Sequence, residues 1–291
     1  MDLHHLKKQL KREIQWEVRT KRFRFTLWFA VVLVLFASTA ALFYGYQYQQ
    51  RTAPQRLFTL GIKQESSGQI DAAEKSYRDI YQHYPQAAEA AKALLRIGKI
   101  WQYDRRDGER ALLSYLQLEH DYPDSSLVLP AREEAAQIVK YTLKDYSRAI
   151  EFYQRLLDLN TGHSDQYYYE IADCYFRLEN YPQARIELEI LLENFPDSPL
   201  APDVLYRKGG ILLLEGRTAA AQRDWQSIIE QYPDSSYRLQ ARFNLAKLLE
   251  EEGALQEALQ SYRQIKGFPY PELLQKKIDH LERRIAEKTG G

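Results

Sequence analysis

The sequence predicts an all-α fold, in which a single N-terminal transmembrane helix is followed by an α-solenoid of about six helical hairpins and a C-terminal capping helix. Three observations support this prediction. An apolar pattern recurs along most of the chain at steps of 35 to 38 residues. A stretch near the N-terminus has no charged residue, and the last helix-like stretch has one apolar face. The expected segments are a leader (1–24), a transmembrane helix (25–46), a linker (47–54), the solenoid (55–270) and the capping helix with its tail (271–291).

The leader is strongly basic, with eight Lys and Arg against three Asp and Glu in residues 1–24. Its apolar residues fall at helical spacing: Leu3, Leu6, Leu10, Ile14 and Val18. Two interpretations of this pattern stay open. One is a short amphipathic helix that lies on the anionic inner leaflet or meets a cytoplasmic partner. The other is an orientation signal that happens to be helical.

Residues 25–46 have the length and composition of a membrane span. A helix of these 22 residues is about 33 Å long at 1.5 Å per residue, and a bilayer core is about 30 Å thick. Aromatic residues crowd both ends, as they do at the two interfaces of a membrane. Because positive charge gathers on the cytoplasmic side, we expect the leader in the cytoplasm and the solenoid across the inner membrane, in the bacterial periplasm.

A cleaved signal peptide is the competing interpretation of this stretch. Ser38-Thr39-Ala40 has the small-x-small form of a cleavage site. The long basic leader and the continuation of the apolar run to Tyr46 favour a retained anchor instead. No cysteine directly follows the apolar run, so a lipoprotein anchor is not expected.

The solenoid prediction depends on a recurring unit. An alanine is followed four residues later by an aromatic residue or leucine, three further on by Ile or Leu, and in most copies by Tyr-Pro or Phe-Pro. The anchor alanines are Ala73, Ala111, Ala149, Ala184, Ala221 and Ala258. These spacings form one apolar stripe on a helix that the proline ends. The copy at Ala149 departs most, because it lacks the proline.

A second helix is expected in each unit, before the anchor alanine. A small residue precedes each anchor by 12 or 13 positions: Gly61, Gly98, Ala136, Ala172, Gly209 and Ala246. Two small residues that face each other let two helix axes approach closely. Stacked hairpins of this kind also need a polar-backed helix over the last unit, which is the expected role of residues 271–288.

This pattern resembles the tetratricopeptide repeat (TPR), whose signature has a small residue in the first helix, an alanine and an aromatic residue in the second, and a terminal proline. The resemblance covers about residues 55–270. Links such as Phe195-Pro196-Asp197-Ser198 are similar to those in TPR domains of bacterial envelope proteins. Such domains serve Tol–Pal coordination, outer-membrane assembly and the translocon.

The resemblance implies a protein or peptide partner in a concave groove lined by the first helices. Groove positions lie three before, one after and four after the small residue. The residues expected there are Tyr169, Asp173, Phe176, Tyr206, Gly210, Leu213, Phe243, Lys247 and Glu250, with Lys99 and Lys140 also pointing inward. For any one of these tyrosines, packing between helices is an equally good interpretation. Phe58 and Ile62 replace the lysine and asparagine with which some TPR domains clamp a C-terminal carboxylate.

Composition argues against several other functions. The chain has 40 basic and 40 acidic residues, so residues 25–291 carry a net charge of −5 without the leader. A mildly acidic array with no basic stripe is a poor nucleic-acid binder. The histidines are scattered, the sequence has no Gly-rich phosphate loop, and the single cysteine, Cys174, is expected to be a buried packing thiol. We therefore expect no enzyme, no metal and no cofactor.

The expected function is a non-enzymatic, membrane-anchored scaffold for protein–protein interactions on the periplasmic side of the inner membrane. The alternative is a periplasmic chaperone that captures unfolded clients near the translocon or during outer-membrane assembly. A mitochondrial import receptor has a similar plan of anchor and repeats, but the flanking charges and the Pro-Asp-Ser links argue against it. The sequence does not identify the partner, the envelope process or the oligomeric state.

Overall fold

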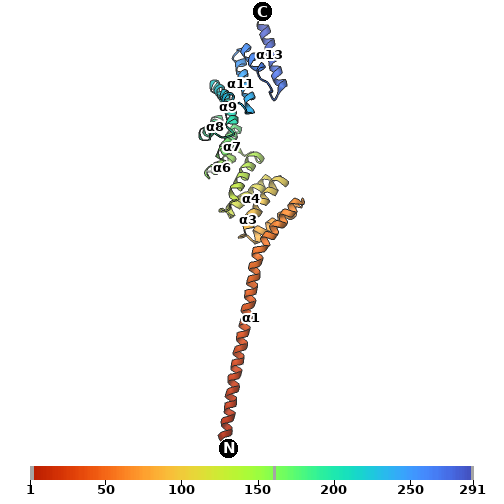
Figure 1. Cartoon of the computed structure of the whole chain (residues 1–291), viewed down its shortest axis with the longest axis vertical. Coiled ribbons are helices and arrows are strands. Elements are labelled where there is room, and N and C mark those ends of the chain that lie inside the picture. Colours follow the sequence, from red (N-terminus) through yellow and green to blue (C-terminus); the bar gives the residue numbers. More distant parts are fainter. Residues whose placement is uncertain (1–2, 160–161, 290–291) are drawn as a thin grey trace. The chain divides into compact units, whose positions relative to one another are not determined.

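The computed structural model describes the backbone of residues 3–159 and 162–289, and the side chains of Trp16, Trp28 and residues 31–159 and 162–288. The predicted all-α class is confirmed. Within these ranges the chain forms α-helices and two short π-helical segments, and no β-strand occurs (Figure 1). The chain divides into two compact units, Met1–Ile100 and Trp101–Gly291.

The first unit contains α1 (Leu3–Ser66), α2 (Ile70–His83) and α3 (Ala88–Lys99). α1 is one uninterrupted helix with Pro54 inside it, so the expected linker, residues 47–54, is helical. α2 packs against both α1 and α3. The helix that contains the apolar stretch is therefore continuous with the first helix of the first repeat.

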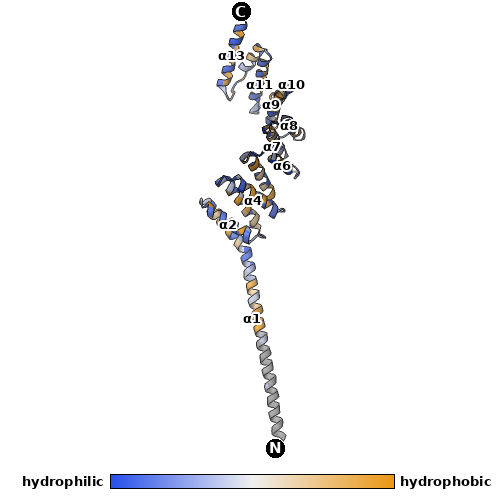
Figure 2. Cartoon of the chain, turned by 180° about the vertical axis from the view of Figure 1, so that it is seen from behind, coloured by the Kyte–Doolittle hydropathy of each residue, from blue (hydrophilic) through white to orange (hydrophobic). Residues whose placement is uncertain are grey.

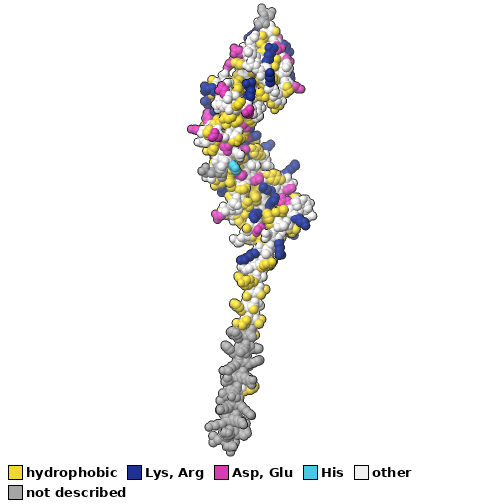
Figure 3. Space-filling model, viewed as in Figure 1, with side chains coloured by type: hydrophobic (Ala, Val, Ile, Leu, Met, Phe, Trp, Pro, Cys, Tyr) yellow, Lys and Arg dark blue, Asp and Glu magenta, His cyan; other side chains and the backbone are white. Residues whose placement is uncertain are grey.

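The side chains of α1 are described continuously from Val31, and the first of them form an apolar band. By length and composition the segment Val31–Ser66 is able to cross a membrane, and its most apolar part is not buried inside the protein. Figure 2 shows this band in orange, and Figure 3 shows it as hydrophobic atoms on the surface of the helix. The helix is thus compatible with an anchor. The apolar side chains of the leader, and those of residues 25–30 other than Trp28, lie outside the described residues.

The remaining elements follow one another closely along the chain. They are η1 (Ile100–Asp104), α4 (Gly108–Asp121), α5 (Val128–Gln137), η2 (Ile138–Thr142), α6 (Tyr146–Leu157), α7 (Ser164–Arg177), α8 (Tyr181–Asn194), α9 (Ala201–Leu214), α10 (Thr218–Gln231), α11 (Tyr237–Glu251), α12 (Leu255–Arg263) and α13 (Pro271–Thr289). Each α-helix from α4 to α12 packs against the next. Neighbouring hairpins therefore share their apolar faces, as stacked repeats do.

The anchor alanines form the core that the repeat pattern predicts. All six are fully buried. The residues four positions later are also buried, and they include Tyr77, Tyr153, Trp225 and Tyr262. Large side chains of the second helix of each hairpin therefore pack beside the small residues of the first.

A turn with one left-handed residue joins the two helices of each hairpin. In every repeat a residue with positive φ lies five positions before the anchor alanine, at Gly68, Arg106, Lys144, Glu179, Gly216 and Gly253. Three of these are not glycine and adopt a conformation that costs roughly 1–2 kcal/mol for a residue with a Cβ atom. In those three repeats the next residue, Asp107, Asp145 or Asn180, caps the second helix by accepting a hydrogen bond from a backbone N–H three residues on.

The final helix, α13, covers the last hairpin. Leu281 is fully buried against the cluster that contains Tyr262 and Phe268. Lys277 and Arg284 form ion pairs with Glu250 of α11, at 2.9 and 3.3 Å. The apolar stripe of this region faces the last hairpin, because Leu274, Ile278 and Ile285 pack against the same cluster as Leu281.

Candidate functional site

A largely apolar pocket of the second unit lies on the first helices of two neighbouring repeats. It has a volume of about 320 Å³. Its walls are Tyr169, Ala172, Asp173 and Phe176 of α7, Leu188 of α8, Tyr206, Arg207, Gly210, Ile211 and Leu214 of α9, and Asn244 of α11. We refer to it as the apolar pocket. Most of its wall is hydrophobic and aromatic, which is typical of sites that accept an apolar side chain.

Two adjacent glycines of α9 have different roles in building this pocket. A Cβ atom on Gly209 would lie 2.5 Å from Nε1 of Trp225, so this position must be glycine for α9 and α10 to pack as they do. A Cβ atom on Gly210 would meet nothing within 4 Å. Because Gly210 is in the pocket wall, the missing side chain leaves space that a ligand is able to fill.

Exposed apolar side chains stand at the rim of the apolar pocket. Phe176 is 42% exposed and Leu214 is 59% exposed, and both are in the wall. Large apolar residues exposed together beside a cavity are typical of interaction surfaces. A partner that covered these two side chains would bury apolar surface that is now exposed to water.

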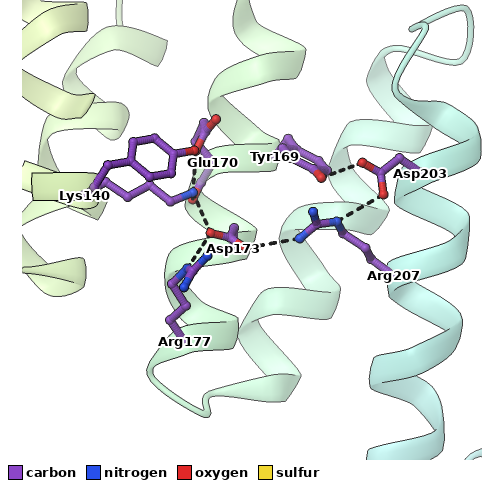
Figure 4. Close-up of polar contacts among 8 residues, drawn as sticks. Lys140, Tyr169, Glu170, Asp173, Arg177, Asp203 and Arg207 are labelled. Atoms are coloured by element: carbon purple, nitrogen blue, oxygen red, sulfur yellow. Dashed lines mark hydrogen bonds and ion pairs between the residues drawn. The ribbon is translucent and has the colours of Figure 1, made fainter. Parts of the chain in front are cut away.

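A network of ion pairs borders the pocket, and Figure 4 shows its members. Asp173 is at its centre, with carboxylate oxygens 2.7 Å from Nζ of Lys140, 2.8 Å from Nε of Arg177 and 3.1 Å from Nη1 of Arg207. Burial alone would raise the pKa of Asp173, but the hydrogen bonds from Lys140 and Arg177 outweigh burial and hold this pKa below its ordinary value. Asp173 is therefore ionised, and its charge is already paired with three cationic side chains of the same chain.

Lys140 is held inside the protein by two carboxylates. Its side chain is 1% exposed and pairs with Asp173 and with Glu170. Burial would lower the pKa of Lys140, yet the hydrogen bonds that its ammonium group donates to Asp173 and Glu170 raise this pKa. The lysine thus stays charged and links η2 to α7, and its amine is not exposed to a partner.

Tyr169 connects α7 to α9 beside the same network. Its hydroxyl donates a hydrogen bond of 2.6 Å to Oδ2 of Asp203, and Arg207 stacks over its ring at 4.8 Å. Burial, followed by the hydrogen bond to Asp203, raises the pKa of Tyr169. The ring is therefore a fixed, neutral wall of the pocket.

A second pocket lies toward the N-terminal end of α7 and has a volume of about 340 Å³. Its lining includes Glu133 and Gln137 of α5, Tyr153 of α6, and Tyr167, Tyr169 and Glu170 of α7, with His163, Gln166 and Leu200 beside them. The lining contains two carboxylates and no Lys or Arg, so we refer to it as the acidic pocket. Tyr169 belongs to the walls of both pockets.

The structure brings some of the expected groove residues together. Tyr169, Asp173, Phe176, Tyr206 and Gly210 all line the apolar pocket. The groove assignment as a binding site is not tested by this geometry and stays a prediction.

Other expected groove residues are engaged elsewhere. Leu213 packs against the core cluster of Trp225, and Phe243 stacks on Phe268 at 4.8 Å. Lys247 is exposed and pairs with Glu251, 3.4 Å away. Lys99 belongs to the first unit, at the end of α3.

Several residues of these walls are not among those expected from the sequence. Arg207 and Asn244 each lie two positions before the small residue of their repeat, and so does Glu170. The repeat register contains this signal, because a polar side chain recurs at the same offset. Leu214 and Glu133 carry no comparable signal in the sequence.

The described residues contain no group of three or more His, Cys, Asp or Glu side chains placed to hold a metal ion. Cys174 is fully buried, as expected, and burial raises the pKa of its thiol to about 12. A thiol of this kind is inert at neutral pH.

Comparisons with known proteins identify the repeat. Two family models described as tetratricopeptide repeat match residues 141–203 and 206–271. A search of curated protein sequences found no match.

Three solved structures are among those similar to this chain. PilW, described as a widely conserved type IV pilus biogenesis factor, is 17% identical over 78% of this chain and 98% of its own, with a TM-score of 0.49. MamA from Desulfovibrio magneticus RS-1 is 12% identical over 63% of this chain and 98% of its own, with a TM-score of 0.48. The apo form of RapI is 14% identical over 80% of this chain and 99% of its own, with a TM-score of 0.48. On the family matches and the recurring buried hairpin, this chain is a tetratricopeptide repeat protein.

Proposed function

We propose that this protein is a non-enzymatic scaffold, anchored in the inner membrane of a bacterial cell, whose repeats hold a protein partner on the periplasmic side. The observation that carries the proposal is the apolar pocket with its two exposed rim residues, Phe176 and Leu214. TPR domains in general bind proteins, and an apolar pocket on their first helices is suited to one anchoring side chain.

The anchor and its orientation rest on separate observations. The apolar band of α1 is exposed in the protein alone, which is costly unless lipid or a partner covers it. The basic leader before this band supports a cytoplasmic N-terminus, because positive charge gathers on the cytoplasmic side of a membrane. The repeats follow on the opposite side, in the periplasm.

Exchange of the rim residues tests the scaffold. In full-length protein purified with its bound partners, Phe176→Ser combined with Leu214→Ser should abolish recovery of a specific partner. The matched control is Leu113→Ser with Ile186→Ser, which changes two exposed apolar residues on α4 and α8, outside the pocket wall. Equal recovery from both double variants would contradict the proposal. So would recovery of many unrelated chains, which a chaperone would give.

The topology has its own test. Because Cys174 is buried and unreactive, single cysteines can be added to the natural chain without a competing thiol. A cysteine at exposed Gln226 should react with a membrane-impermeant maleimide in cells with a permeabilised outer membrane. A cysteine at Gln9 of the leader should react only after the inner membrane is opened. The reverse pattern would refute the orientation.

A further inference from the structure

The apolar pocket and the acidic pocket together define the chemistry of the segment that this groove accepts. We infer that the partner inserts an apolar side chain beside Gly210 and places a basic side chain, Lys or Arg, against Glu133 and Glu170. This inference rests on the proposed scaffold function and adds the chemical class of the bound segment.

The space at Gly210 is suited to an apolar side chain of the partner. The pocket is open at this position, and its walls include the rings of Tyr169, Phe176 and Tyr206. The polar side chains at its border already have partners within the chain, since Asp173 pairs with three cations and Arg207 also pairs with Asp203. A charged side chain of the partner would be desolvated there without an unpaired counter-ion, whereas an apolar side chain needs none.

The carboxylates of the acidic pocket are suited to a basic side chain of the partner. Glu133 accepts a hydrogen bond of 2.5 Å from Tyr167 and lies 3.3 Å from Nδ1 of His163 through the same oxygen, Oε1. Glu170 pairs with Lys140 and Tyr141 through Oε2. Among the described residues, the second oxygen of each carboxylate has no hydrogen-bond partner. Aromatic rings beside these oxygens also favour a cation.

The charge balance points the same way. Lys140, Arg177 and Arg207 balance the charges of Glu170, Asp173 and Asp203. Among the described residues, Glu133 forms its ion pair with His163, which is charged only when protonated, and no Lys or Arg lines the pocket. The surplus negative charge of the acidic pocket is therefore that of Glu133. A basic side chain gains a charge-assisted hydrogen bond there, and an acidic one would be repelled.

The shared wall fixes the spacing of the two side chains. The residues of α7 that line the two pockets are centred between four and five positions apart, which is about 7 Å along a helix axis. An extended segment covers about 7 Å in two residues. The inferred motif is therefore a basic and a large apolar residue separated by about two positions, in a segment without acidic residues near the basic one.

Peptide display on the full-length protein in lipid nanodiscs tests the inference. The probe is a library of random 12-residue peptides, selected on the natural chain and on two variants. Selection on the natural chain should enrich Lys or Arg about two positions from Phe, Trp or Leu. Gly210→Leu, which fills the apolar pocket, should remove the preference for the large apolar residue.

The second variant separates the two halves of the motif. Glu133→Gln with Glu170→Gln keeps the size of both side chains and removes their charge. It should weaken binding of the best selected basic peptide about tenfold and abolish its salt dependence, while the apolar preference remains. Thermal unfolding of each variant, followed by circular dichroism, checks that the repeats are still folded.

Three results would overturn the inference. They are enrichment of acidic peptides, failure of any peptide to bind, and loss of basic and apolar preference together in the glutamine variant while it stays folded. In each case the scaffold proposal is judged separately. If the Phe176 and Leu214 exchange still releases a specific partner, the scaffold stands and only the assigned chemistry fails. If that exchange also has no effect, both fail.

Discussion

The two adjacent glycines of α9 give a sharp test of how the repeats pack. We predict that Gly209→Ala destabilises the protein, whereas Gly210→Ala, one position later in the same helix, stabilises it. The two substitutions add the same methyl group to the same helix. They differ in what the new atom meets, because Gly209 faces Trp225 and Gly210 faces the open pocket.

The magnitudes follow from the structure. At Gly209 the new Cβ would lie 2.5 and 2.8 Å from Nε1 and Cε2 of a Trp225 ring that is only 2% exposed. Forcing extra volume into a packed core costs about 1–3 kcal/mol. If the ring moves, its 3.2 Å hydrogen bond to the carbonyl of Tyr206 is strained, which costs about 1 kcal/mol more. Alanine gains about 1 kcal/mol over glycine inside a helix.

The net effects are therefore of opposite sign. Gly209→Ala should lower the free energy of unfolding by about 1–3 kcal/mol. Gly210→Ala should raise it by about 0.5–1 kcal/mol. Urea unfolding of the full-length protein in detergent, followed by circular dichroism, measures both. Gly61→Ala should behave like Gly209→Ala, because its Cβ would lie 2.5 Å from Cε1 of Tyr77. Equal changes for Gly209 and Gly210, or the opposite order, would refute the close approach of helix to aromatic ring.

Three further predictions concern single side chains. Lys140→Met should lower the free energy of unfolding at pH 7 by about 3 kcal/mol, since it leaves Asp173 and Glu170 without their shared cation. Because the folded pKa of Asp173 is lowered, its contribution to stability is present above its ordinary pKa of 3.8 and is lost as pH falls through the folded value. In Lys140→Met this loss should begin at a higher pH in urea titrations, and an unchanged pH profile would contradict the network. Lys144→Gly should raise the melting temperature, because glycine adopts its φ of 56° without strain, and a lower melting temperature would exclude this turn. Cys174 should stay unmodified by a maleimide at pH 7.5 and react in denaturant; fast labelling of the folded protein would show that the thiol is not buried.

Much of the fold could be predicted from the sequence because every repeat buries side chains at the same positions. The anchor alanine and the aromatic residue after it must be buried together, so their spacing recurs, and all six alanines are indeed buried. The helix bounds were less predictable. The expected linker at 47–54 is helical because neither Gly nor a second Pro breaks the helix around Pro54.

The site was predicted less completely, because groove position and packing position look alike in a sequence. Tyr169 and Tyr206 line the pocket, while Phe243, at the same offset in its repeat, stacks on Phe268 beneath α13. Lys140 was expected to point toward a partner, but two carboxylates that lie 30 and 33 residues away hold it inside. Pairings between repeats of this kind depend on how the hairpins stack, and the spacing within one repeat does not reveal them.

The most direct test of the central claim is site-specific photocrosslinking in living cells. A photoreactive amino acid would replace Phe176 or Leu214 at the pocket rim, and, as matched controls, Leu113 or Ile186 on α4 and α8. The account predicts one discrete protein adduct from the two rim positions, absent from the two controls and reduced by Gly210→Leu in the same chain. The same adduct from all four positions, or none from the rim, would contradict the claim that this pocket holds the partner.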